Sequence, residues 1–331
     1  MTGCANEKNN FTKYLNMRKI LVTGGAGFIG SALVEKLIAD HENMVIVIDD
    51  LTTGNIKKLP PQNGNPYQFI KCNVNEYRQI SEIMLSFKFD YVFHYAALVG
   101  VQRTQENPIK VLRDIEGIKN ILSLSKNTAV KRIFFSSSSE IYGEPVEFPQ
   151  NVYTTPLNSR LPYAIVKNVG EAFLRSYKQE YGVNYTIFRF FNTFGPKQSR
   201  DFVISRFLLR ALENKDIPIY GDGKQTRTFC YIEDNVDACV KCFAENHIVN
   251  DVINVGGNIE TPILDLANLI IKLTDSKSKI VFLPPLKDGD MSRRLPDNAR
   301  MQEILGRPLL PLEQGIKKII ETGLFEANVE G

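Results

Sequence analysis

A glycine-rich segment near the start of the chain constrains the fold more than any other feature. Residues 24–30 read G-G-A-G-F-I-G, in the spacing G-x-x-G-x-x-G, between an apolar run at 20–22 and an amphipathic segment at 31–40. A strand, a glycine turn and a helix in this order expose backbone amides at a helix N-terminus, where a dinucleotide pyrophosphate binds. The residues expected to contact such a cofactor are Gly24, Gly27, Phe28, Ile29 and Gly30.

A second apolar run, 44–48, ends at two acids, Asp49 and Asp50. Asp49 lies 19 residues after Gly30, where an acid that binds the adenosine ribose hydroxyls is expected. A carboxylate there repels a 2′-phosphate, so the segment favours NAD over NADP.

Strand-like and helix-like segments alternate through the first half of the chain. Strands are expected at 20–22, 45–48, 68–72, 91–94, 132–136 and 185–189, and helices at 31–40, 77–87, 107–127 and 163–181. This order predicts an α/β fold, a Rossmann doubly wound parallel sheet. Helices at 203–214, 235–245, 263–272, 298–305 and 312–322, with Pro and Gly turns between them, predict a smaller C-terminal α/β lobe. We expect a mobile extension over 1–16, an NAD-binding domain over 17–195 with a return near 228–255, and mainly a substrate lobe over 196–331.

The composition excludes several classes of function. A net charge of +3 over 331 residues, without a dense Lys/Arg run, gives no case for nucleic acid. Charges or prolines interrupt every apolar stretch before membrane-spanning length, and the first sixteen residues lack the apolar core of a secretory signal. Cys239 and Cys242 form a C-x-x-C inside a helical pattern and are expected to be buried helix positions. Three scattered histidines give no metal site, and a cytoplasmic, metal-free protein is expected.

A serine cluster and a Tyr-x-x-x-Lys pair carry the candidate chemistry. Serines occupy 136–139, and Tyr163 and Lys167 are four apart, so they share one face of a helix. A tyrosine with a pKa near 10 is a poor base at neutral pH. A lysine ammonium one turn away, helped by the positive charge of a nicotinamide, stabilises the phenolate. Ser138 can share the hydrogen bond to the reacting substrate oxygen.

Together these motifs resemble those of the extended short-chain dehydrogenases/reductases of the NAD-dependent epimerase/dehydratase family, which act on nucleotide-diphosphate sugars. The resemblance covers nearly all of the chain from Met17. Its marks are residues 23–30, 49–51, 94–97, 138–143, Tyr163 with Lys167, 189–196, 221–229 and 293–297.

The resemblance implies a role for each matching residue. Tyr163 would deprotonate the sugar 4-hydroxyl, Lys167 would hold the nicotinamide ribose and lower the tyrosine pKa, and Ser138 would be the catalytic serine. Further NAD contacts would come from Asp50, Asn73, Val74, Ala96 and Ala97. Substrate contacts would come from Ser139, Asn192, Arg227, Arg293 and Arg294, with the arginines on the diphosphate. A homodimer would form through a four-helix bundle built from 107–127 and 163–181.

Departures from the family pattern leave the exact reaction open. Ser139-Glu140 stands where dehydratases carry Asp-Glu, which argues against 4,6-dehydration and leaves Glu140 as a catalytic base or hydrogen-bond partner. Ser139-Glu140 and the run at 293–297 resemble UDP-glucuronate decarboxylases, whereas the short loop at 197–202 resembles sugar 4-epimerases. Asn73 replaces an Asp that often contacts adenine, and Asp114 replaces an Asn. The leading expectation is a 4-epimerase acting on a nucleotide-diphosphate sugar, most readily a UDP-sugar. The alternatives are a UDP-glucuronate decarboxylase, a C4 dehydrogenase or 4,6-dehydratase, and a non-catalytic NAD-binding regulatory protein.

Overall fold

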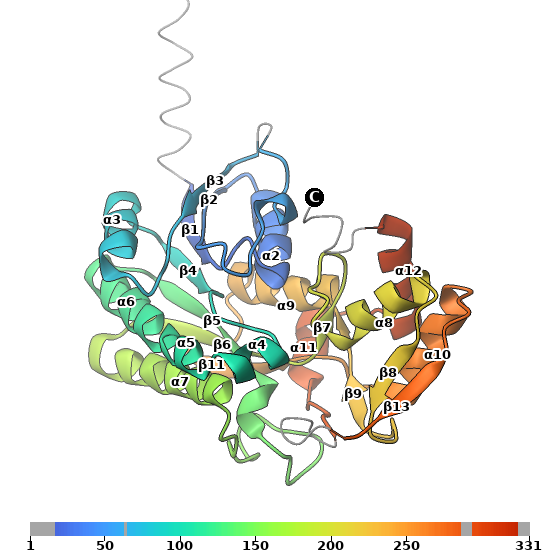
Figure 1. The fold of residues 1–331 in the computed structure, drawn as a ribbon. Coiled ribbons are helices and arrows are strands. Elements are labelled where there is room, and N and C mark those ends of the chain that lie inside the picture. Colours follow the sequence, from blue (N-terminus) through green and yellow to red (C-terminus); the bar gives the residue numbers. More distant parts are fainter. Residues whose placement is uncertain (1–16, 63–64, 286–292, 324–331) are drawn as a thin grey trace, which may run out of the picture.

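A central parallel sheet organises the molecule (Figure 1). The computed structural model describes residues 17–62, 65–285 and 293–323, so the expected extension at 1–16 lies outside the described residues. Seven strands lie in the order β11-β6-β5-β4-β1-β2-β3, and all neighbours run parallel. They are β1 (Arg18–Thr23), β2 (Asn43–Asp49), β3 (Tyr67–Lys71), β4 (Tyr91–His94), β5 (Arg132–Ser138), β6 (Asn184–Phe190) and β11 (Asp251–Val255). The Rossmann prediction is confirmed, because the order reverses beside β1 as in a doubly wound sheet.

Helices cover both faces of this sheet, so each strand is apolar on both sides. In β1, Ile20 and Val22 pack in one core and Leu21 packs in the other, as the alternation of side chains along a strand requires. The first core includes α2 (Phe28–Ile38), α9 (Ile232–Ala244) and α11 (Ala299–Leu305). The second includes α3 (Tyr77–Phe87), α6 (Asp114–Asn127) and α7 (Pro162–Tyr181). Figure 1 shows these two layers around the sheet.

The C-terminal part adds short strands and helices beside the sheet (Figure 1). Its helices are α8 (Val203–Leu212), α10 (Ile263–Leu273) and α12 (Leu312–Thr322). Its strands are β7 (Thr193–Phe194), β8 (Ile217–Tyr220), β9 (Thr226–Thr228), β10 (Cys230–Tyr231), β12 (Glu260–Pro262) and β13 (Ile280–Leu283), which form three two-stranded sheets. Between these segments the chain returns to the central sheet as β11, which pairs with β6.

The prediction of one helix over 107–127 is wrong in one respect, because the structure divides this segment at Arg113. The structure has α4 (Val101–Glu106), α5 (Pro108–Leu112) and then α6. The amide of Gly117 donates to Oδ1 of Asn75 at 3.0 Å instead of to the carbonyl four residues back. A side chain from outside the helix therefore takes one hydrogen bond of its first turn, and α6 starts anew at Asp114.

Other expectations concern cysteines, metals and membranes. Cys239 and Cys242 are buried on α9, which confirms their expected place. In the described ranges, no cluster of three or more His, Cys, Asp or Glu side chains is arranged to hold a metal ion. None of the helices in that part of the chain has the length and apolarity needed to cross a membrane.

Candidate active site

A cavity of about 1000 Å³ opens at the carboxyl ends of the parallel strands. It gathers 18 of the 20 residues that the sequence analysis assigned to cofactor, catalysis or substrate: Gly24, Gly27, Phe28, Ile29, Gly30, Asp49, Asp50, Asn73, Val74, Ala96, Ala97, Ser138, Ser139, Glu140, Tyr163, Lys167, Asn192 and Arg294. The other two, Arg227 and Arg293, are not part of its lining.

The glycine segment forms one end of the cavity, and its shape excludes side chains. A Cβ on Gly30 would lie 2.2 Å from the carbonyl oxygen of Gly24, and one on Gly24 would lie 2.7 Å from the backbone of Ala96. Gly24 also has φ of +67°, which favours glycine. Helix α2 begins directly after Gly27, so its N-terminus faces the cavity. These close approaches leave a cradle that fits a dinucleotide pyrophosphate.

Asp49 fixes this turn against the end of β2. Its carboxylate accepts hydrogen bonds from the amides of Ala26 at 3.0 Å and Leu51 at 2.8 Å. Burial raises the pKa of Asp49, and the two amide hydrogen bonds oppose that shift. Each carboxylate oxygen retains a second lone pair, so Asp49 can still accept from ribose hydroxyls. The geometry is therefore compatible with the ribose contact that the sequence predicts.

Sequence reasoning missed the role of Thr23 and His94. The hydroxyl of Thr23 accepts from the amides of Tyr95 and Ala96, each at 3.1 Å, and lies 2.9 Å from Nδ1 of His94. Burial, and then Lys167, lower the pKa of His94 to about 3, so the ring is neutral and Nδ1 accepts the Thr23 proton. The sequence signal available was that Thr23 follows the strand expected at 20–22 and His94 ends the strand expected at 91–94. The structure pairs the two positions across β1 and β4. This bridge fixes the segment after β4 that carries Ala96 against the glycine turn.

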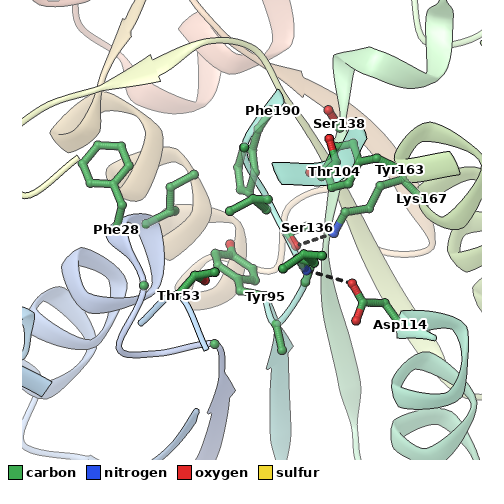
Figure 2. A pocket seen from close by; sticks show the side chains of 18 of the residues that line it. Phe28, Thr53, Tyr95, Thr104, Asp114, Ser136, Ser138, Tyr163, Lys167 and Phe190 are labelled. Atoms are coloured by element: carbon green, nitrogen blue, oxygen red, sulfur yellow. Dashed lines mark hydrogen bonds between the residues drawn. The ribbon is translucent and has the colours of Figure 1, made fainter. Parts of the chain in front are cut away.

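Tyr163 and Lys167 lie on one face of α7, across the cavity from the glycine segment (Figure 2). Nζ of Lys167 donates to Oγ of Ser136 at 3.2 Å and lies 5.6 Å from the centre of the Tyr163 ring. Burial lowers the pKa of Lys167 to about 8, and Asp114 acts in the opposite direction. Burial, and then Glu140, raise the pKa of Tyr163, while a hydrogen bond with Ser138 opposes them. The phenol is therefore protonated at neutral pH in the ligand-free chain.

The serine cluster belongs to β5, which extends to Ser138 and is buried throughout. Ser136 meets Lys167, and Ser138 caps the following turn by accepting from the amide of Glu140 at 3.1 Å. Because side chains alternate along a strand, these two serines face the cavity side and Ser137 faces Glu171, to which it donates at 2.7 Å.

Charged and polar side chains from distant segments also line the cavity. Arg294 donates to Glu140 at 2.7 Å and to Oγ of Ser139 at 3.3 Å, and it is buried. Asn192 also lines the cavity and donates to the carbonyl of Thr228 at 3.0 Å. Glu140 thus has a cation as its direct partner.

The two arginines outside the lining are engaged elsewhere. Arg293 makes a bidentate pair with Glu260, at 2.5 and 2.6 Å, and its guanidinium lies 4.1 Å from the centre of the Phe148 ring. Arg227 donates to the carbonyl of Thr226 at 2.7 Å. Neither side chain is among those that line the cavity.

Comparison with known proteins agrees with this geometry. The model of the NAD dependent epimerase/dehydratase family matches residues 20–256. The chain belongs to this family. Family membership confirms the prediction of an NAD-dependent enzyme. The glycine cradle fits that cofactor.

The proteins similar to this chain include decarboxylases and 4-epimerases. UDP-glucuronic acid decarboxylase 1 of Danio rerio is 35% identical over 321 residues, covering 94% of this chain and 74% of that protein. The UDP-glucose 4-epimerase of Thermotoga maritima, solved with UDP-glucose, has a TM-score of 0.85 at 33% identity and covers 92% of this chain and 97% of that one. The UDP-glucose 4-epimerase of Thermus thermophilus, solved with NAD, has a TM-score of 0.82 at 26% identity and covers 95% and 99%. Both reactions are compatible with the family assignment.

Proposed function

We propose that this family member is an NAD-dependent 4-epimerase of a nucleotide-diphosphate sugar, with a UDP-sugar as substrate. The observation that carries the proposal is one continuous cavity with the glycine cradle at one end and Tyr163, Lys167 and Ser138 at the other. Its volume lies at the upper end of the usual range for a ligand pocket, as expected when cofactor and sugar share a site. The relative solved with UDP-glucose supports the substrate class.

The side chains divide the chemistry between them. Tyr163, in its phenolate form, removes the proton of the sugar 4-hydroxyl, and Ser138 shares the hydrogen bond to that oxygen. The Lys167 ammonium lowers the cost of the phenolate and donates to the nicotinamide ribose. Bound NAD supplies the hydride acceptor for C4 and, once reduced, the hydride donor. After oxidation, Tyr163 returns its proton to the 4-oxygen when the keto-sugar presents its other face.

The predicted NAD contacts follow from the position of each residue along the cavity. The glycine segment would hold the pyrophosphate, Asp49 the adenosine ribose, and Ala96 and Ala97 the middle of the dinucleotide. Asp50, Asn73 and Val74 lie beside Asp49 and would surround the adenine. Substrate contacts would come from Ser139, Asn192 and Arg294, with Arg227 and Arg293 closing on the diphosphate.

The pairing of Arg294 favours a neutral hexose over a uronic acid. In the ligand-free chain, the two terminal nitrogens of its guanidinium donate to Ser139 and Glu140. A sugar carboxylate near Arg294 would therefore also meet the carboxylate of Glu140, and like charges disfavour that arrangement. A hydroxymethyl group at the same place meets no such charge.

UDP-glucuronate decarboxylation is the second candidate. It would require Arg294 to exchange Glu140 for the substrate carboxylate, against the repulsion between that carboxylate and Glu140. The decarboxylase relative from Danio rerio supports this candidate.

We also propose a cytoplasmic homodimer. The outer surfaces of α5 and α7 expose apolar side chains, among them Ile109, Leu112 and Ile165. Pairing α5–α6 and α7 with the same helices of a second copy would bury these side chains in a four-helix bundle. Sedimentation equilibrium with Ile109→Glu and Ile165→Glu tests this, and a dimer unaffected by both changes contradicts it.

Product analysis decides between the reactions. The purified protein is incubated separately with UDP-glucose, UDP-N-acetylglucosamine and UDP-glucuronate, and the products are identified by mass spectrometry and proton NMR. Unchanged mass with inverted C4 supports the epimerase, and loss of CO₂ supports the decarboxylase. Release of a keto-sugar or loss of water supports a dehydrogenase or a dehydratase. Tyr163→Phe should retain NAD but lose turnover, and full activity in that variant contradicts the mechanism.

A further inference from the structure

One acid in the cavity has no part in the mechanism above. Asp114 is the first residue of α6, directly after the break at Arg113, and it lines the cavity. Its carboxylate accepts from the amide of Leu98 at 2.8 Å and from Nδ2 of Asn75 at 3.3 Å. Figure 2 shows Asp114 with one hydrogen bond reaching its carboxylate. The break in the helix thus places a negative charge in the cavity and anchors it from two sides.

Lys167 is the cation that shares this space. It is 3% exposed, and in the described ranges of the chain it has no carboxylate within 4 Å, the limit for an ion pair. Its ammonium donates to the neutral hydroxyl of Ser136. Figure 2 shows the Asp114 carboxylate on the same side of the cavity as the Lys167 ammonium and below it in this view. A buried ammonium without a direct counter-ion is costly unless a nearby charge compensates it.

The other charged groups around this pair have different effects. His94 on β4 is neutral, and Tyr163 on α7 is protonated. Burial raises the pKa of Asp114, and the Asp50 carboxylate after β2 also raises it. The hydrogen bonds of Asp114 and the charge of Lys167 lower that pKa. Lys110 and Arg113 of the preceding segment also line the cavity, but both are exposed to solvent. Glu140 acts on Tyr163 and is itself paired with Arg294.

We propose that Asp114 is a positioning residue whose carboxylate, anchored by Leu98 and Asn75, keeps the buried Lys167 ammonium protonated at neutral pH without pairing with it directly. Because Asp114 does not pair with Lys167 directly, some N–H donors of the ammonium remain. The donors that Ser136 does not use can bind the ribose and the phenolate. A direct ion pair would occupy those donors. The proposal deepens the proposed function, since Lys167 serves Tyr163 in that reaction.

The direction of the effect follows from the charges. Asp114 raises the pKa of Lys167, against the lowering by burial, and it also raises the pKa of Tyr163. Removing the charge therefore lowers both pKa values. Lys167 then loses its proton at a lower pH, and Tyr163 ionises at a lower pH.

Lysine NMR on the ligand-free chain tests the charge without any turnover. Lysine Cε is labelled with ¹³C, the Lys167 signal is assigned with Lys167→Met, and its pKa is read from a pH titration. Asp114→Asn can keep the hydrogen bond from Leu98, whereas Asp114→Ala loses it. We expect the pKa of Lys167 to fall by about one unit or more in both variants. Glu116→Gln removes an exposed acid from the same helix turn and should leave the Lys167 pKa unchanged.

An unchanged Lys167 pKa in Asp114→Asn overturns the proposal, and so does a fall confined to Asp114→Ala. A second readout follows the rate of sugar-substrate conversion against pH. Both limbs of that profile should move to lower pH in Asp114→Asn, and a fixed profile or an alkaline shift contradicts the proposal. If the wild type converts no sugar nucleotide to a product, the proposed function fails, while the NMR titration still decides the role of Asp114.

Discussion

Replacing Glu171 by glutamine should destabilise the helix that carries Tyr163 and Lys167. Glu171 is fully buried on α7, one turn after Lys167. Its carboxylate accepts from Nε and Nη2 of Arg189 at 2.9 and 2.8 Å and from Oγ of Ser137 at 2.7 Å. Arg189 is only 2% exposed, so the variant leaves a buried guanidinium without its counter-charge.

The expected size of the effect follows from that burial. Removing one partner of a buried ion pair costs about 3–5 kcal/mol, a large part of a typical unfolding free energy of about 5–15 kcal/mol. For a domain of this size, such a loss lowers Tm by roughly 10 °C. Urea unfolding followed by circular dichroism measures the difference. Glu180→Gln is the matched control, because Glu180 is exposed on the same helix and should change the free energy by less than about 0.5 kcal/mol.

The loss of unfolding free energy in Glu171→Gln should also depend on pH. Burial alone would raise the pKa of Glu171, but hydrogen bonds and charge from Arg189, together with Ser137, lower it overall. A lowered folded-state pKa means that the stabilisation is present above the unfolded-state value of about 4.3 and is lost as pH falls through the folded-state value. The difference in unfolding free energy between wild type and Glu171→Gln should therefore decrease below about pH 4. A difference in unfolding free energy under about 1 kcal/mol at pH 7 refutes the argument, and so does a difference that stays constant below about pH 4.

Two further predictions concern the cavity rim and the buried thiols. Arg103→Ala removes the 2.9 Å ion pair with Asp201 that joins α4 to the loop before α8 beside the cavity, so NAD should dissociate several-fold faster in a cofactor-release assay. Unaltered release would show that this pair does not retain the cofactor. Burial raises the pKa of Cys242 to about 12 and that of Cys239 well above its ordinary value, so neither thiol should react with iodoacetamide at pH 8 before unfolding. Mass spectrometry of the native protein checks this, and rapid labelling of either residue contradicts it.

The parts of the site that depend on local geometry were predictable from the sequence. The glycine segment needs one strand, one turn and one helix, all within about twenty residues. Tyr163 and Lys167 need only the spacing of one helical turn. Asp49 follows from the length of the first β-α-β unit. Each of these residues lines the cavity because its position is fixed by neighbours along the chain.

Residues whose partners are distant in sequence could not be placed in the same way. Arg293 and Arg294 are adjacent and chemically identical, yet one pairs with Glu260 and the other with Glu140. Neighbouring side chains in an extended segment point to opposite sides, and the sequence does not say which side faces the cavity. The break before Asp114 likewise depends on Asn75, a residue 42 positions before Gly117.

The Glu140–Arg294 contact links 154 positions of sequence, and this separation has a consequence for biosynthesis. A chain leaves the ribosome from its N-terminus, so the glycine segment and α7 emerge well before Arg294, the last of the cavity-lining residues along the chain. During that interval the cofactor end of the cavity has all its parts, whereas Glu140 still lacks its cation. Translation order therefore delivers the cofactor-end residues to the folding chain before the cation that completes the sugar end.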